Sequence, residues 1–250
     1  MLTKDKAICL RVVDYSETSQ IVTFFTKANG KVGAIAKGSK RPKSAFDGPI
    51  EMLSYGEIVF SDPSKEKLAT LIEFHQQSFK HLINDFFAFN SCLFAAELLN
   101  KLTHDNDPYP ELFDSFLQFL QDINERRETR DERREVLSLL ILFQLTLLRE
   151  IGLMPVLNAC ANCKTQYAIH DTQYEFYFSS SANGLICRDC EISFPDKIKL
   201  STNAANCLAN LKQITQATEK TLREIEKILI SHFTELLGHL PKMAKHILKG

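Results

Sequence analysis

Two Cys-x-x-Cys pairs constrain the fold of this chain more than any other feature. Cys160 and Cys163 form the first pair, Cys187 and Cys190 form the second, and residues 164–186 separate them by 23 positions. Structural zinc prefers four tetrahedral thiolates, and each pair supplies two of them from one tight turn. Four cysteines leave no coordination position open for water, so we predict a structural Zn²⁺ site and not a catalytic one.

The spacer between the two pairs is slightly longer than is usual for a zinc ribbon. We expect the additional residues to form a β-hairpin, with a strand starting at Tyr174 and a turn at Asn183-Gly184. A thioredoxin-like redox pair is the alternative, but neither pair follows a strand in a βαβ pattern. Cys9, Cys92 and Cys207 lie in apolar surroundings and are expected to be small buried hydrophobic residues.

The first 80 residues have the short, β-branched apolar segments that are typical of strands. Asn29-Gly30 predicts a two-residue type I′ turn, which needs positive φ at both positions. Five strands in so short a segment indicate a small barrel, and the OB-fold is the common nucleic-acid-binding barrel of that size. The expected strands are 7–13, 20–25, 31–37, 50–60 and 68–75.

From Phe79 onward the apolar spacing becomes helical. The expected helices are 79–102, 111–123, 137–151, 202–213 and 219–240. The sequence therefore predicts an α+β protein, in which a five-stranded OB-fold barrel precedes an all-helical domain with a zinc-binding insert of four cysteines. The predicted division is an OB-fold DNA-binding domain at 1–78, a first helical part at 79–157, the zinc module at 158–195 and a second helical part at 196–250.

A basic segment lies within the predicted barrel. No acidic residue occurs between Thr18 and Phe46, although the whole chain has a formal net charge of -1. Such a local concentration of positive charge suggests a polyanion partner, and a solvated loop is the alternative. The candidate DNA-binding residues are Lys31, Lys37, Lys40, Arg41 and Lys43, and the candidate base-stacking residues are Tyr15, Phe24 and Phe25.

The motifs of common enzymes are missing. Gly33 to Lys40 resembles a phosphate-binding loop, but its order is Gly-Ser-Lys instead of Gly-Lys-Ser, and Pro42 blocks the helix that should follow. His232, His239 and His246 recur at heptad spacing, which predicts a solvated stripe on one helix face. No apolar segment has the length of a membrane span or the form of a signal peptide. We expect a cytoplasmic protein that is not an enzyme.

The order of several motifs resembles the RecO family of bacterial recombinational DNA-repair proteins. These motifs are Asp14-Tyr-Ser-Glu-Thr-Ser-Gln, Ala36-Lys-Gly-Ser-Lys-Arg-Pro-Lys-Ser44, Gly152-Leu-Met-Pro155 before the first cysteine pair and Asn183-Gly-Leu-Ile-Cys187 at the second. The resemblance covers most of the chain, and the C-terminal helices match only in pattern.

The resemblance implies a recombination mediator with an OB domain and a zinc-bearing helical domain. Such a protein binds single- and double-stranded DNA and anneals complementary strands. It works with RecR and RecF to load RecA onto DNA coated by single-stranded DNA-binding protein, and it contacts the acidic, apolar C-terminal tail of that coating protein. A cytoplasmic, nucleoid-associated location follows.

Two other classes of function remain open. The near-neutral charge suits a protein-binding adaptor that uses the barrel and zinc module as scaffolds without strong direct DNA binding. A zinc-ribbon enzyme is the third and weakest hypothesis, because no open metal site or nucleophile is visible. Charge reversal at Lys37, Lys40 and Arg41 separates the mediator from the adaptor.

Overall fold

The structure is a computed structural model that describes residues 2–42, 44–46, 48–61, 68–82, 85–126, 132–166 and 175–249. It contains two compact units, residues 1–125 and 126–250. The division into a DNA-binding domain, two helical parts and a zinc module stays a prediction.

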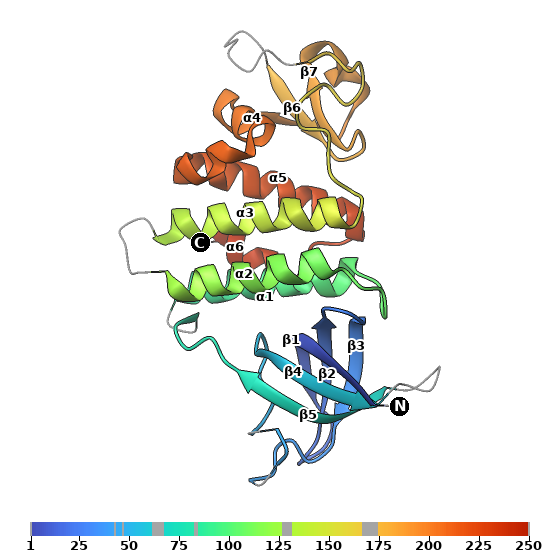
Figure 1. Cartoon of the computed structure of the whole chain (residues 1–250). Helices are drawn as coiled ribbons and strands as arrows, with labels where there is room; N and C mark the ends of the chain where they lie inside the picture. Colours follow the sequence, from blue (N-terminus) through green and yellow to red (C-terminus); the bar gives the residue numbers. More distant parts are fainter. Residues whose placement is uncertain are drawn as a thin grey trace. The chain divides into compact units, whose positions relative to one another are not determined.

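The first unit contains the predicted five-stranded barrel, which is confirmed (Figure 1). The barrel is closed in the order β1-β2-β3-β5-β4, which is OB topology; β3 and β5 pair in parallel and the other neighbours pair antiparallel. The long β1 closes it by pairing with β2 along one half and with β4 along the other. The strands are β1 (Leu2–Asp14), β2 (Gln20–Thr26), β3 (Gly30–Ala36), β4 (Tyr55–Ser61) and β5 (Ala69–Gln77).

The turn between β2 and β3 differs from the predicted type I′ turn. Only Gly30 has positive φ, at 67°, so the hairpin has a longer loop of residues 27–29. Asp5 explains this difference, because its carboxylate accepts hydrogen bonds from the main-chain N–H of Ala28 and Asn29 and from the Asn29 side chain. The carboxylate thereby satisfies the donors of a turn that is one residue longer than expected.

Two helices, α1 (Phe86–Leu102) and α2 (Pro110–Glu125), complete the first unit. Asp85 begins α1 as its N-cap and accepts hydrogen bonds from the main-chain N–H of Phe87 and Ala88. The predicted helix start at Phe79 was therefore several residues too early. Phe79 instead stacks on Tyr55 of β4, with the ring centroids 4.8 Å apart.

The second unit packs α3 (Glu132–Glu150) against α5 (Glu219–Leu237) and carries a small three-stranded sheet in the order β7-β6-β8 (Figure 1). Its strands are β6 (Phe176–Ser179), β7 (Gly184–Cys187) and β8 (Ile198–Leu200). The expected β-hairpin is confirmed, but its turn comprises residues 180–183, with Asn183 at φ 50°, and Gly184 already begins β7. Tyr174 lies outside the described residues.

The last part of the chain is more divided than the apolar spacing predicted. The segment expected as one helix forms α4 (Thr202–Ala209) and the 3₁₀ helix η3 (Leu211–Gln216). Gly238 ends α5 in the left-handed conformation at φ 71°, and a short α6 (Ala244–Lys249) follows. No helix in the described ranges combines the length and the apolar character that crossing a bilayer requires.

The prediction for the three C-terminal histidines was wrong. Gly238 separates His232 in α5 from His239 and His246, so they cannot share one helix face. His232 is 1% exposed and meets the ring of Phe178 edge-on at 5.4 Å. Burial lowers the pKa of His232 to about 4, so this side chain is neutral and belongs to the core.

Candidate metal centre and nucleic-acid interface

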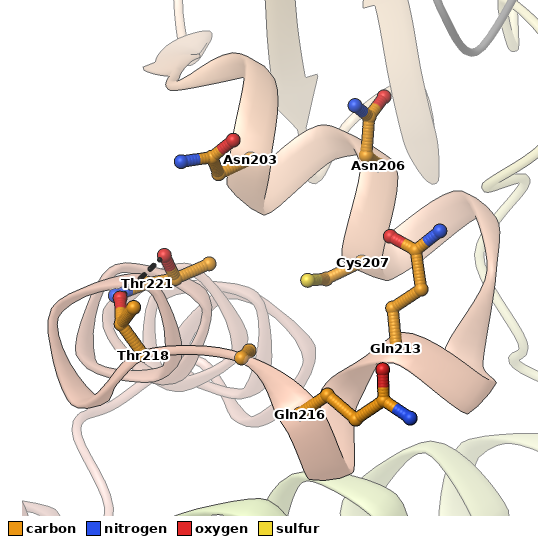
Figure 2. Close-up of a pocket in the computed structure, with 8 residues that line it drawn as sticks. Asn203, Asn206, Cys207, Gln213, Gln216, Thr218 and Thr221 are labelled. Atoms are coloured by element: carbon orange, nitrogen blue, oxygen red, sulfur yellow. Dashed lines mark hydrogen bonds between the residues drawn. The ribbon is translucent and has the colours of Figure 1, made fainter.

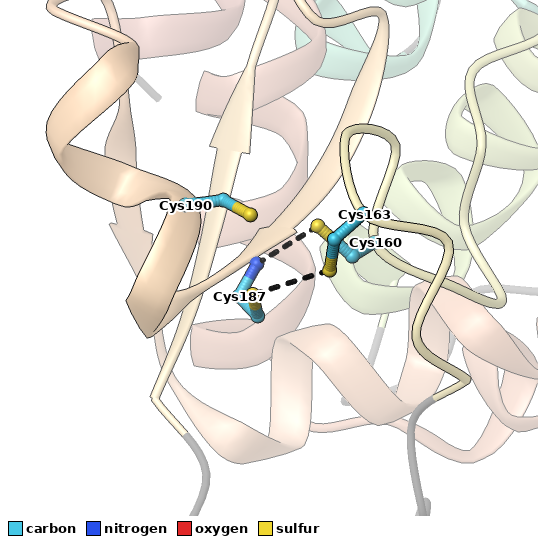
Figure 3. A group of neighbouring side chains, drawn as sticks. All are labelled: Cys160, Cys163, Cys187 and Cys190. Atoms are coloured by element: carbon cyan, nitrogen blue, oxygen red, sulfur yellow. Dashed lines mark hydrogen bonds between the residues drawn. The ribbon is translucent and has the colours of Figure 1, made fainter.

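The structure brings the four predicted cysteines of the zinc module together (Figure 3). The sulfur atoms of Cys160, Cys163, Cys187 and Cys190 all lie within 4.8 Å of one another, and those of Cys163 and Cys187 are 3.7 Å apart. Four sulfurs at 2.3 Å from one tetrahedral ion would be about 3.8 Å apart. The donor set and its spacing therefore fit a tetrahedral thiophilic metal ion.

Two turns from distant parts of the sequence position these sulfurs. The first turn closes where the N–H of Lys164 donates to the carbonyl of Cys160 at 3.0 Å, with Lys164 in the left-handed conformation at φ 64°. The second pair lies at the end of β7 and in the 3₁₀ helix η2 (Arg188–Ser193). The N–H of Ala161 donates to the carbonyl of Leu185 at 2.7 Å and fastens the first turn to β7.

Hydrogen bonds favour the thiolate form at the first cysteine pair, whereas burial favours the thiol at Cys187. Burial alone would raise the pKa of Cys160, but main-chain hydrogen bonds at Cys163, Cys187 and Asn162 outweigh it and lower that pKa to about 6. Hydrogen bonds at Thr165 lower the pKa of Cys163, whereas burial raises the pKa of Cys187 to about 12. The metal-free cluster thus retains protons that a divalent cation would displace as it binds.

Hydrogen bonds hold the backbone of the turn after β3, and charged side chains project from it. The hydroxyl of Ser39 is buried and donates to the Gln20 carboxamide at 2.8 Å, and Gly38 takes the left-handed conformation at φ 72°. The N–H of Lys40 donates to the carbonyl of Thr18 at 3.1 Å, which fastens the turn to the loop after β1. Small residues in this motif therefore anchor the backbone that carries the charged side chains.

Three of the five predicted DNA-binding residues lie on this turn. Lys37 and Arg41 are exposed, and neither has an ion pair among the described residues. Lys40 pairs with Asp14 at 2.8 Å, with its own side chain 29% exposed and that of Asp14 65% exposed. Such an exposed pair contributes about 0–1 kcal/mol, so a phosphate can replace the carboxylate. Lys43 lies outside the described residues.

Lys31 has a different environment. Its ammonium group donates to the carbonyl oxygens of Asn100 at 2.7 Å and Thr103 at 2.9 Å, and it lies 3.2 Å from the Asp105 carboxylate. The side chain is only 12% exposed. Lys31 therefore satisfies carbonyl groups at the C-terminus of α1, where a cation is favourable. Its ammonium group thus has two carbonyl acceptors and one carboxylate neighbour within the protein, and its role in DNA binding stays a prediction.

Of the three aromatic candidates for base stacking, two are buried and one is exposed. Phe24 packs inside the barrel against Phe74 at 5.1 Å, and Phe25 packs on the outside against Phe113 of α2 at 6.1 Å. Both are fully buried, so they cannot stack on bases. Tyr15 is 63% exposed and remains available for stacking.

The structure adds Arg11 as a cation that the sequence did not predict. A β-bulge between Cys9 and Arg11 reverses the alternation of β1, so Cys9 faces the core and Arg11 is exposed. Arg11 is paired with Thr23 of β2, which is paired in turn with Gly33 of β3. Strict alternation from Ala7 and Cys9 would have placed Arg11 inside the barrel, so only the bulge reveals it.

Comparison with known proteins agrees with this architecture. The family model "Recombination protein O N terminal" matches residues 1–77, and "Recombination protein O C terminal" matches residues 83–246. The protein named DNA repair protein RecO from Bacillus pumilus is 30% identical, over 98% of this chain and 93% of its own length. The protein of the same name from Bacillus subtilis is 30% identical, over 95% of this chain and 91% of its own length. The protein of that name from Salinibacter ruber is 41% identical, over 45% of this chain and 44% of its own length.

An OB-type barrel joined to a helical unit with a tetracysteine cluster, together with these matches, defines a protein of DNA repair and recombination. The chain belongs to the RecO family.

Proposed function

We propose that this chain is a recombination mediator, not an enzyme, that binds single- and double-stranded DNA. It anneals complementary strands and helps to load RecA onto DNA coated by single-stranded DNA-binding protein. The observation that carries the proposal is the anchored turn after β3, which exposes Lys37 and Arg41 on a barrel of OB topology. Membership of the RecO family gives the proposal its cellular context.

In this proposal the barrel follows the phosphate backbone with Lys37, Lys40, Arg41 and Lys43, and Tyr15 stacks on a base. Each neutralised phosphate of a single strand releases a counterion. Four such contacts predict that log K falls with log salt at a slope of about -3. Arg11 is an additional cation on the outer face of the barrel.

The tetracysteine cluster of this proposal holds Zn²⁺ in a structural role. RecR, with RecF, and the C-terminal tail of single-stranded DNA-binding protein are the proposed protein partners, and the helical part of the chain is the proposed surface for that tail. A cytoplasmic, nucleoid-associated location accompanies these partners.

Anisotropy of a labelled single strand across a salt series tests the proposal. The triple variant Lys37→Glu, Lys40→Glu, Arg41→Glu should lose tight binding and the steep salt dependence. The control variant Lys220→Glu, Lys227→Glu, Lys245→Glu has the same net charge, because it reverses exposed lysines of the second unit. Equal loss in both variants would show that net charge, and not the barrel turn, governs binding.

A protein-binding adaptor is the second candidate. The environments of Lys31 and Lys40 favour it, because both ammonium groups already have protein partners, and the chain has a net charge of -1. Weak DNA binding that the barrel variant leaves unchanged, with retained binding of RecR, would favour the adaptor.

A further inference from the structure

A polar pocket in the second unit lies outside the proposed DNA and metal sites. It has a volume of about 340 Å³ and lies among α4, η3 and the first turn of α5 (Figure 2). Its lining combines carboxamides and hydroxyls with two small apolar side chains: Asn203, Asn206, Cys207, Gln213, Gln216, Ala217, Thr218 and Thr221. The volume is at the lower end of the range for ligand-binding pockets.

The four carboxamides are available for a ligand. None of the side chains of Asn203, Asn206, Gln213 and Gln216 has a hydrogen bond to another described residue. The Thr218 hydroxyl, in contrast, is already used, because it accepts from the N–H of Thr221 at 3.3 Å as the N-cap of α5. Each carboxamide offers both donors and an acceptor, so together they complement a group in which donors and acceptors alternate.

The described lining residues favour an uncharged ligand. They include no lysine, arginine or histidine, so they offer a phosphate or carboxylate no opposite charge. They include no acidic side chain, the group that usually lies beside a bound amine or hard metal ion. They also include no aromatic ring or guanidinium plane, the groups on which unpaired bases stack.

We propose that this pocket binds an uncharged, extended peptide segment of a partner protein through the main-chain N–H and C=O groups of that segment. An extended peptide presents donors and acceptors in alternation, which is the pattern that carboxamides pair with. Cys207 and Ala217 provide only small apolar contacts, so the segment carries small or polar side chains where it enters. This proposal does not depend on DNA binding by the barrel.

The carboxamide groups themselves report on occupancy. Side-chain NH₂ signals of Asn and Gln are visible in ¹H–¹⁵N correlation spectra, and single substitutions to Asp or Glu assign them. We would titrate the zinc-loaded full chain with a capped, uncharged peptide of Gly, Ser and Asn. Parallel titrations would use a single-stranded oligonucleotide and an acidic peptide with an apolar end.

The uncharged peptide should shift the NH₂ signals of Asn206 and Gln213, whereas the other two probes should leave them unchanged. Replacing either residue by Leu should weaken peptide binding about fivefold, the effect of one hydrogen bond. Gln121→Leu, a half-exposed carboxamide of α2, is the matched control and should bind normally. Thermal melts of all variants exclude misfolding.

Two outcomes would overturn the proposal. If the oligonucleotide or the acidic peptide shifts these signals and the uncharged peptide does not, the pocket recognises a nucleobase or an anionic segment. If no probe moves them at millimolar concentration, the carboxamides are only a solvated surface.

Discussion

Glu226 makes the stability of the second unit depend on pH. This carboxyl group is 2% exposed on α5, and the Gln144 carboxamide of α3 donates to its Oε1 at 2.8 Å. Burial raises its pKa from 4.5 to about 7, and the hydrogen bond from Gln144 offsets only part of that effect. Glu226 Oε2 and Gln144 Oε1 have no partner among the described residues, so a proton on Oε2 would supply the missing donor.

The sign of the effect follows from linkage. The folded protein holds this proton more tightly than the unfolded chain, so the contribution of Glu226 to stability is largest below about pH 4.5. This contribution falls as the pH rises from about 4.5 to about 7, and it stays lower above that value. A shift of this size corresponds to a loss of about 3 kcal/mol in the free energy of unfolding.

Glu226→Gln removes this loss and keeps the shape of the side chain. We expect the variant to exceed the wild type by up to about 3 kcal/mol at pH 8, with a smaller difference near pH 5. Urea unfolding of the zinc-loaded proteins, followed by far-UV circular dichroism, measures this difference in the free energy of unfolding. Both proteins carry the same cysteines, so their difference isolates Glu226.

Glu235→Gln, on the exposed face of the same helix, is the control and should change neither stability nor its pH dependence. Parallel pH profiles for Glu226→Gln and the wild type would falsify the reasoning, because the Glu226 carboxyl would then have the same pKa in the folded and unfolded protein.

Three further predictions concern the barrel and the metal site. Lys31→Met should reduce stability by about 1–3 kcal/mol, because it leaves carbonyl groups at the end of α1 without their donor. The slope of log K against log salt for DNA binding should stay as in the wild type. A shallower slope would show that Lys31 contacts DNA. Phe25→Ala should lower stability, measured by calorimetry, by about 3–5 kcal/mol, because its side chain is buried. Tyr15→Ala should keep the melting temperature and weaken single-strand binding, measured by anisotropy, by about 1–3 kcal/mol. A stable Phe25→Ala and an unstable Tyr15→Ala would contradict the assigned burial. Cys163→Ser should reduce bound zinc, measured by elemental analysis, from about one ion per chain to a small fraction. Wild-type protein should release protons when it binds zinc. Full zinc content in the variant would show that Cys163 is not a ligand.

The elements that the sequence predicted well have short-range causes. Period-2 alternation places the barrel strands, because it depends only on neighbouring residues. The cysteine pairs predict their cluster, because few other arrangements explain two such pairs in one chain.

The features that the sequence did not reveal have long-range causes. Lys31 lies in a basic segment, but its partners are α1 carbonyls about 70 residues later in the chain. Phe25 lies on the outer face of β2, where Phe113 of α2 packs against it. The β2–β3 turn depends on Asp5 in another strand, and the exposure of Arg11 depends on a bulge. None of these contacts leaves a periodic signal in the sequence.

The contacts between the barrel and the first two helices determine where this protein can be divided. Gly30 lies so close to Asp107 that a Cβ would clash with its carbonyl oxygen, and the N–H of Asn106 donates to the carbonyl of Lys31 at 3.1 Å. A fragment that ends after β5 would expose the ring of Phe25 and leave the Lys31 ammonium without its acceptors. The smallest portion suited to crystallisation or NMR therefore extends to Glu125, well beyond the last barrel strand.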